Sequence, residues 1–95
     1  MDGITDSQRV VRFSPVGETL IKHVLRKLLE GPAKVDELDE YAKNVIANIT
    51  ARQRINYDHT VWLQMLRILK LVEVENNIVR IAKGRENIAR AIAYD

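Results

Sequence analysis

The chain has 95 residues, the length of one domain that is large enough for a single hydrophobic core. Hydrophobic residues make up 46% and charged residues 29%, which excludes wholesale disorder, and a formal net charge of +2 points to no class of partner by itself. Cysteine is absent, which excludes disulfides, thiolate metal sites and a thiol nucleophile. No apolar run reaches the roughly 18 residues of a membrane span and the N-terminus does not read as a signal peptide, so we expect a cytoplasmic protein.

Residues 1–13 are expected to form an N-terminal arm ahead of a first helix. Ser14 is a good N-cap, and Pro15 occupies the first helical position, where its missing N–H costs nothing. Apolar residues at 16, 20, 21, 24, 25 and 28 form one stripe, while charged residues and His23 fill the other, solvated face. Gly31 followed by Pro32 ends this helix.

Residues 33–35 are too few for more than a bridging strand, and a second helix follows. Asp36 is expected to cap it, with Asp39 three residues later as in a capping box. Four early acids, between residues 36 and 40, are explained by the positive end of the helix dipole and receive no functional interpretation. The predicted apolar stripe is Leu38, Tyr41, Ala42, Val45, Ile46 and Ile49.

Residues 50–58 have no strong periodicity and are expected to add a turn to the second helix before a loop. Asp58 is the predicted N-cap of a third helix, which runs to about Lys70. The buried stripe of the third helix is expected to consist of Trp62, Met65, Leu66 and Leu69, with Val61 and Ile68 beside it.

The stretch VEVENNIVRI, residues 72–81, predicts a β-hairpin with a two-residue turn, because Asn76 and Asn77 tolerate the positive φ angles of such a turn. An isolated hairpin is marginal in water, so its apolar face is expected to cover the helices. Counting outward from the turn gives the apolar pairs Val74–Val79 and Val72–Ile81, and on the other face the pair Glu73–Arg80.

The order helix, short strand, helix, helix, hairpin and C-terminal helix predicts a mainly α fold with a small β-hairpin, of the α+β class. The expected division is an arm at 1–13, a domain at 14–83 and a C-terminal helix at 84–95. From Ser14 to about Lys83 the chain resembles the winged helix-turn-helix superfamily, particularly the small archaeal and archaeal-virus transcription regulators. The stretch WLQMLRILKLVEVENNIVRI carries most of the likeness, although the linker of residues 49–58 is longer than the turn of the simplest members.

The resemblance implies that the third helix reads DNA in the major groove. Thr60, Gln64 and Arg67 lie at i, i+4 and i+7 and form a polar stripe opposite the apolar side. Gln and Arg are the residue types that make bidentate contacts to adenine and guanine edges. The alternative is the polar face that any surface helix needs.

Basic and amide side chains just before that helix suit phosphate oxygens, which position a protein without reading sequence. These residues are Arg52, Arg54, Asn56 and His59. Arg9 and Arg12 in the arm are similar to basic arms that enter an adjacent minor groove. The alternatives are a solvated connector and a frayed terminus or strand. His23 and His59 are 36 positions apart without a paired carboxylate, so no metal site is expected.

Asn76, Asn77 and Arg80 are the candidate DNA contacts of the wing, as the resemblance names the hairpin. A wing that touches DNA usually carries Lys or Arg at its tip, whereas this one carries Glu73 and Glu75, which a polyanion repels. Either the hairpin stands away from DNA or the two asparagines alone touch the groove.

The C-terminal helix is too short to persist by itself and carries apolar residues on more than one stripe. One stripe would pack on the first helix, and Ile88, Ala89 and Ile92 are expected to include the contacts of a two-fold homodimer. Two third helices would then meet half-sites about 34 Å apart. In the alternative, this helix merely closes its own core.

The leading hypothesis is therefore a winged-helix protein that binds double-stranded DNA sequence-specifically as a transcription regulator, without a cofactor. The rival is a winged-helix protein–protein interaction module in a larger transcription or replication assembly, which the weak net charge and the acidic hairpin favour. An enzyme is not expected, because the sequence has no phosphate-binding loop, no nucleophile–base pairing and no metal-ligand spacing.

Overall fold

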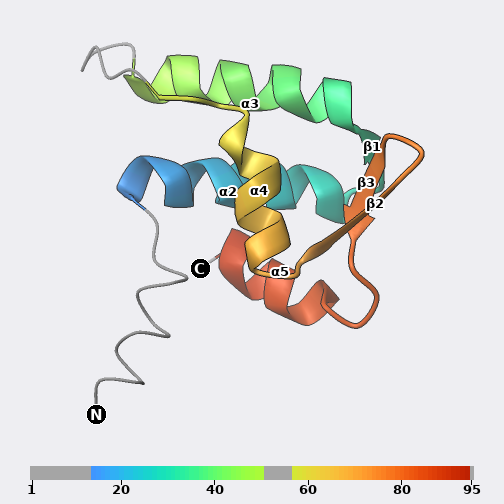
Figure 1. The fold of residues 1–95 in the computed structure, drawn as a ribbon. Helices are drawn as coiled ribbons and strands as arrows, with labels where there is room; N and C mark the ends of the chain where they lie inside the picture. Colours follow the sequence, from blue (N-terminus) through green and yellow to red (C-terminus); the bar gives the residue numbers. More distant parts are fainter. Residues whose placement is uncertain (1–13, 51–56, 95) are drawn as a thin grey trace.

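A computed structural model of the chain describes residues 14–50 and 57–94 (Figure 1). The elements in that part are α2 (Pro15–Leu29), β1 (Ala33–Lys34), α3 (Val35–Thr50), α4 (Val61–Ile68), β2 (Val72–Glu75), β3 (Ile78–Ile81) and α5 (Glu86–Ala93). The fold is mainly helical with a small antiparallel sheet, which confirms the predicted α+β class. The predicted arm lies outside the described residues.

Helix α2 begins as the sequence predicts and forms the centre of the fold. The Ser14 hydroxyl oxygen accepts a hydrogen bond from the Gly17 N–H at 3.1 Å, which caps the first turn. The predicted apolar stripe is buried except at its first residue, Val16, and α3, α4 and α5 all pack against α2. His23 differs from the expectation: it is half-buried, and its Nδ1 lies 2.9 Å from the carbonyl oxygen of Thr19.

Helix α3 begins at Val35, two residues before the start that an Asp36 N-cap implies, so Asp36 lies in its first turn and is not its N-cap. The reason is a contact from outside the helix: the Val35 N–H donates to the carbonyl oxygen of Asn77 in the hairpin turn at 2.9 Å. Asp36 still favours the positive end of the helix dipole from the first turn. The predicted stripe is confirmed, with Tyr41 and Ile49 half-buried and the other four residues buried.

Helix α4 starts at Val61, later than predicted, because Asp58 caps a turn that precedes the helix. Its Oδ1 accepts hydrogen bonds from the backbone N–H of Thr60 at 3.0 Å and from the Thr60 hydroxyl at 2.6 Å. The helix ends at Ile68, two residues before the expected end. Lys70 has a φ of +58°, and the chain leaves the helix there.

The hairpin forms with the predicted turn and register. Asn76 and Asn77 have φ angles of 53° and 66°, as a two-residue turn with two left-handed residues requires. The strand pairs include all three predicted ones, Val72–Ile81, Glu73–Arg80 and Val74–Val79. The predicted bridging strand is confirmed as β1, which adds to the free side of β3 and gives the sheet order β1-β3-β2.

One face of this sheet completes the core beside the helices. Val72 and Val79 are buried, as are Leu71 and the fully enclosed Trp62 of α4. Figure 1 shows α4 lying across α2, with α3 on one side, α5 on the other and the hairpin projecting from the end of α2. In the described part of the chain, no helix has both the length and the apolar character needed to cross a membrane.

Candidate nucleic-acid interface

The outward face of α4 carries the three predicted base-reading residues. Burial of Trp62, Met65 and Leu66 fixes the inward face of the helix. The other side of the helix is exposed and carries Thr60, at the N-cap position, together with Gln64 and Arg67. The structure therefore brings these three side chains together on one surface, along with the exposed Ile68 and Lys70.

A hydrogen bond between two helices sets the position of α4. The buried indole of Trp62 donates from Nε1 to Oδ1 of Asp39 on α3 at 2.6 Å. A hydrogen bond to a carboxylate is stronger than one between neutral groups, so it holds the two helices in a defined relation. Sequence reasoning missed this role for Asp39. A buried Trp usually needs a partner for its N–H, which was the available signal, but nothing in the spacing identified the partner.

The turn before α4 decides what Thr60 can offer to a ligand. Its hydroxyl hydrogen points to Asp58, so the oxygen remains as an acceptor and the methyl group as an apolar contact. The same hydroxyl, followed by the Thr60 N–H, lowers the pKa of the Asp58 carboxyl below its ordinary value by stabilising the carboxylate. Thr60 therefore suits a base edge that donates a hydrogen bond or presents a methyl group.

His59 is the one predicted phosphate contact that falls within the described residues, and it is half-buried at the start of this turn. Arg52, Arg54 and Asn56 lie in residues 51–56, outside the described part, and Arg9 and Arg12 lie outside it in the arm. His59 lies directly before α4, and its carbonyl accepts a hydrogen bond from the Trp62 N–H.

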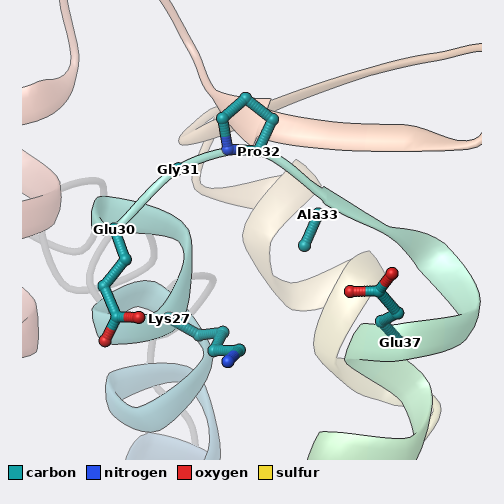
Figure 2. Close-up of a pocket in the computed structure, with 6 residues that line it drawn as sticks. All are labelled: Lys27, Glu30, Gly31, Pro32, Ala33 and Glu37. Atoms are coloured by element: carbon teal, nitrogen blue, oxygen red, sulfur yellow. The ribbon is translucent and has the colours of Figure 1, made fainter.

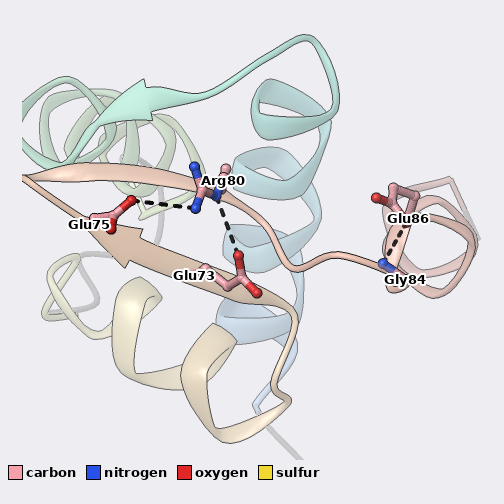
Figure 3. A network of polar contacts seen from close by, with 5 residues as sticks. All are labelled: Glu73, Glu75, Arg80, Gly84 and Glu86. Carbon is pink, nitrogen blue, oxygen red and sulfur yellow. Dashed lines mark hydrogen bonds and ion pairs between the residues drawn. The ribbon is translucent and has the colours of Figure 1, made fainter.

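The outer face of the hairpin holds Arg80 between two carboxylates (Figure 3). Its Nε lies 3.3 Å from Oε1 of Glu73, and its terminal nitrogen lies 3.6 Å from Oε1 of Glu75. The guanidinium is thus already compensated, and the predicted wing contact at Arg80 would compete with these pairs. Asn76 and Asn77 are exposed at the turn, where their side chains are accessible.

Helix α5 is part of the domain, and this corrects one of the predicted dimer residues. Ala89 is fully buried against the core, so it does not face a partner. Ile92 is half-buried against the same core, whereas Ile88 is 44% exposed and Tyr94 is 64% exposed. The Arg26 guanidinium fastens the end of α5 to α2, because its Nε donates to the Ala93 carbonyl at 2.7 Å and it lies over the Tyr94 ring.

A second feature lies away from α4, in a surface groove where α2 turns into α3 (Figure 2). Its lining residues are Lys27, Glu30, Gly31, Pro32, Ala33 and Glu37. The ammonium of Lys27 also lies 5.7 Å from the centre of the Tyr41 ring and makes a cation–π contact with it. Across residues 14–50 and 57–94, no three His, Asp or Glu side chains are grouped in a way that would hold a metal ion.

Comparison of the chain with protein-family models, with curated proteins and with solved structures gave no match.

Proposed function

We propose that the chain is a winged helix-turn-helix protein that binds double-stranded DNA and regulates transcription, with α4 as its recognition helix. Three features of the fold support this. The elements follow the order that the resemblance implies, α4 lies across α2 beside α3, and the hairpin projects next to the end of α4. In this arrangement the outer face of α4 is exposed and is free to enter a groove.

The observation that carries the proposal is the chemistry of the outer face of α4. From Val61 to Lys70 the sequence contains no acidic residue, and the exposed side chains include Gln64, Arg67 and Lys70. Phosphate oxygens line both sides of the major groove, so the absence of carboxylates from this stretch removes charge repulsion along the helix, and the nearest acid before it, Asp58, is hydrogen-bonded to Thr60. Gln64 would then read adenine and Arg67 guanine through bidentate contacts, while Thr60 accepts a hydrogen bond or contacts a thymine methyl.

A titration against random duplex DNA at two salt concentrations, about 50 and 200 mM, tests the proposal. Binding that releases counterions weakens as salt rises, because each neutralised phosphate contributes about −0.9 to the slope of log K against log salt. A clear salt slope is the expected result. Absence of binding at the lower salt concentration would contradict the proposal.

The second candidate function is a protein-interaction module, and the hairpin favours it. Glu73 and Glu75 outnumber the one cation between them, Arg80, so the outer face of the hairpin is acidic. A basic protein surface would complement this face, whereas DNA would not. Under this alternative, binding to duplex DNA is absent, and substitutions of Glu73 and Glu75 weaken the protein complex.

The proposal includes a homodimer formed through the outer side of α5. Ile88, Ala91 and Tyr94 are exposed there at spacings of three residues, so they follow one side of the helix. The small Ala91 permits a close approach of two helices, and a two-fold axis would use this same face twice.

A further inference from the structure

The backbone of Lys70 has a conformation that residues with a Cβ rarely adopt. Its φ is +58°, in the left-handed region, and it directly follows the last turn of α4. Two hydrogen bonds define the turn: Lys70 N–H to the Arg67 carbonyl at 3.0 Å, and Leu71 N–H to the Leu66 carbonyl at 3.0 Å. This pair of bonds is the Schellman motif, in which glycine usually occupies the left-handed position.

The fold requires this turn. Leu71 and Leu66 are both buried, so the chain must reverse within the motif to bring Leu71 under the helix. Leu71 also accepts a hydrogen bond from the Ala82 N–H at 2.8 Å, which ties the start of the hairpin to its end. Glycine would satisfy every one of these contacts without steric strain, so the lysine side chain is not needed for the turn itself.

The charges around Lys70 leave its ammonium group available. Lys70 is exposed, and Arg67 is exposed one turn earlier. The acids that follow in the chain, Glu73 and Glu75, are both engaged by Arg80. Within the described residues, neither Lys70 nor Arg67 is paired with a carboxylate. Two cations therefore gather at the end of α4, where the exposed helix carbonyls carry partial negative charge and would otherwise repel an anion.

We propose that Lys70 binds a backbone phosphate of the DNA at the rim of the major groove. The inference rests on the proposed function of α4. A recognition helix lies in the major groove with its N-terminal residues at the base edges, so the opposite end of the helix lies closer to the rim of the groove. With Thr60 and Gln64 at the base edges, Lys70 lies past the end of α4 and is the exposed cation of this surface nearest to the phosphates of the rim.

This role explains why a lysine occupies a position that suits glycine. A backbone outlier of this kind is retained where the side chain contributes something that the fold does not need. The competing explanation is that Lys70 only complements the dipole at the end of α4. The two explanations differ in their consequences for DNA binding, which makes them separable.

The test compares Lys70→Gly, Lys70→Arg and the control Lys43→Gln, which removes one exposed lysine charge from α3. Thermal unfolding and the affinity for random duplex DNA are measured for each, at about 50 and 200 mM salt. Lys70→Gly is expected to raise the unfolding midpoint by a few degrees, because glycine relieves the left-handed strain, and to make the slope of log K against log salt shallower by about 0.9 for each chain bound. Lys70→Arg and Lys43→Gln are expected to keep the wild-type slope.

Three results would overturn the inference. An unchanged slope in Lys70→Gly would show that Lys70 makes no phosphate contact. The proposed function would still stand if the wild-type chain binds duplex DNA. An equal change in Lys43→Gln shows an effect of net charge and not of position. A wild-type chain that binds no duplex DNA at either salt concentration removes the proposed function and, with it, this role of Lys70.

Discussion

The indole N–H of Trp62 and the carboxylate of Asp39 form a 2.6 Å hydrogen bond that joins α4 to α3. Asp39→Ala leaves this N–H without a partner, which costs about 1–3 kcal/mol of the free energy of unfolding. Asp39→Asn keeps an acceptor oxygen and should lose less. Urea unfolding followed by Trp62 fluorescence measures both. Glu40→Ala is the matched control on the same helix and should stay within about 0.5 kcal/mol of wild type, because Glu40 is exposed. An equal loss in both alanine variants would show that the hydrogen bond does not position α4.

Gln64→Ala tests whether α4 reads bases. A bidentate contact discriminates against the wrong base by about 1–3 kcal/mol, so affinity for the preferred site should fall by that amount and affinity for random DNA should hardly change. Fluorescence anisotropy with a selected site and a random duplex gives both values. Asn44→Ala removes an exposed amide from α3 and serves as the control. Equal losses on both duplexes would mean that Gln64 does not read sequence.

Replacing Glu73 and Glu75 together with Gln should raise the affinity for random DNA, because it removes two carboxylates and frees the Arg80 guanidinium. The cost in stability should be small, about a few tenths to 1 kcal/mol, since the Glu73–Arg80 pair is about half exposed. Filter binding and thermal unfolding check the two effects. A marked loss of DNA binding would instead show that these carboxylates orient the hairpin.

The carboxyl of Asp58 provides a pH-dependent test of the turn before α4. The Thr60 hydroxyl lowers its pKa below the ordinary value of 3.8, so the carboxylate form stabilises the folded chain. That contribution is complete above the unfolded pKa and is lost as the pH falls through the lower folded pKa. Thr60→Val should move the pKa back up toward 3.8, as measured by an NMR titration of the side-chain carboxyl. A pKa that does not move would mean that this hydrogen bond is not formed in solution.

Light scattering on the full chain and on Ile88→Glu tests the dimer. A dimer that becomes a monomer in the variant, with unchanged circular dichroism, is the expected result, because a charge at this exposed position disrupts an apolar contact. Lys43→Glu on α3 is the control and should leave the dimer intact. A full-length chain that is already a monomer contradicts this part of the proposal. Removal of α5 is a poor test, since Ala89 and Ala93 are buried in the core.

Local chemistry made much of the fold predictable. The cap at Ser14 and the apolar stripe of α2 depend on residues a few positions apart, and so does the Asn76-Asn77 turn. The register of the hairpin then follows from the turn, because a two-residue loop fixes every pair that extends from it. The outward position of Gln64 and Arg67 follows from helical spacing in the same way.

The missed features depend on contacts between distant elements. Asp39 resembles a capping residue in the sequence, and its bond to Trp62 exists because α3 and α4 pack together. Ala89 has the same local pattern as an exposed alanine, and packing on α2 is what buries it. The late start of α4 has a local cause. The Asp58 side chain accepts a hydrogen bond from the Thr60 N–H and closes a turn, so the helix begins only after that turn. Periodicity does not distinguish these alternatives.

The hydrogen bond from the Val35 N–H to the Asn77 carbonyl ties the tip of the hairpin to the first turn of α3. Strand β1 also pairs with β3, so the hairpin is held along one edge as well as at its tip. A hairpin held in this way has little freedom to tilt and adapt to grooves of different width. If α4 docks as proposed, the DNA would have to change shape to fit the protein. Flexible pyrimidine–purine steps under the hairpin would then be preferred over stiff A-tracts at positions that no side chain touches.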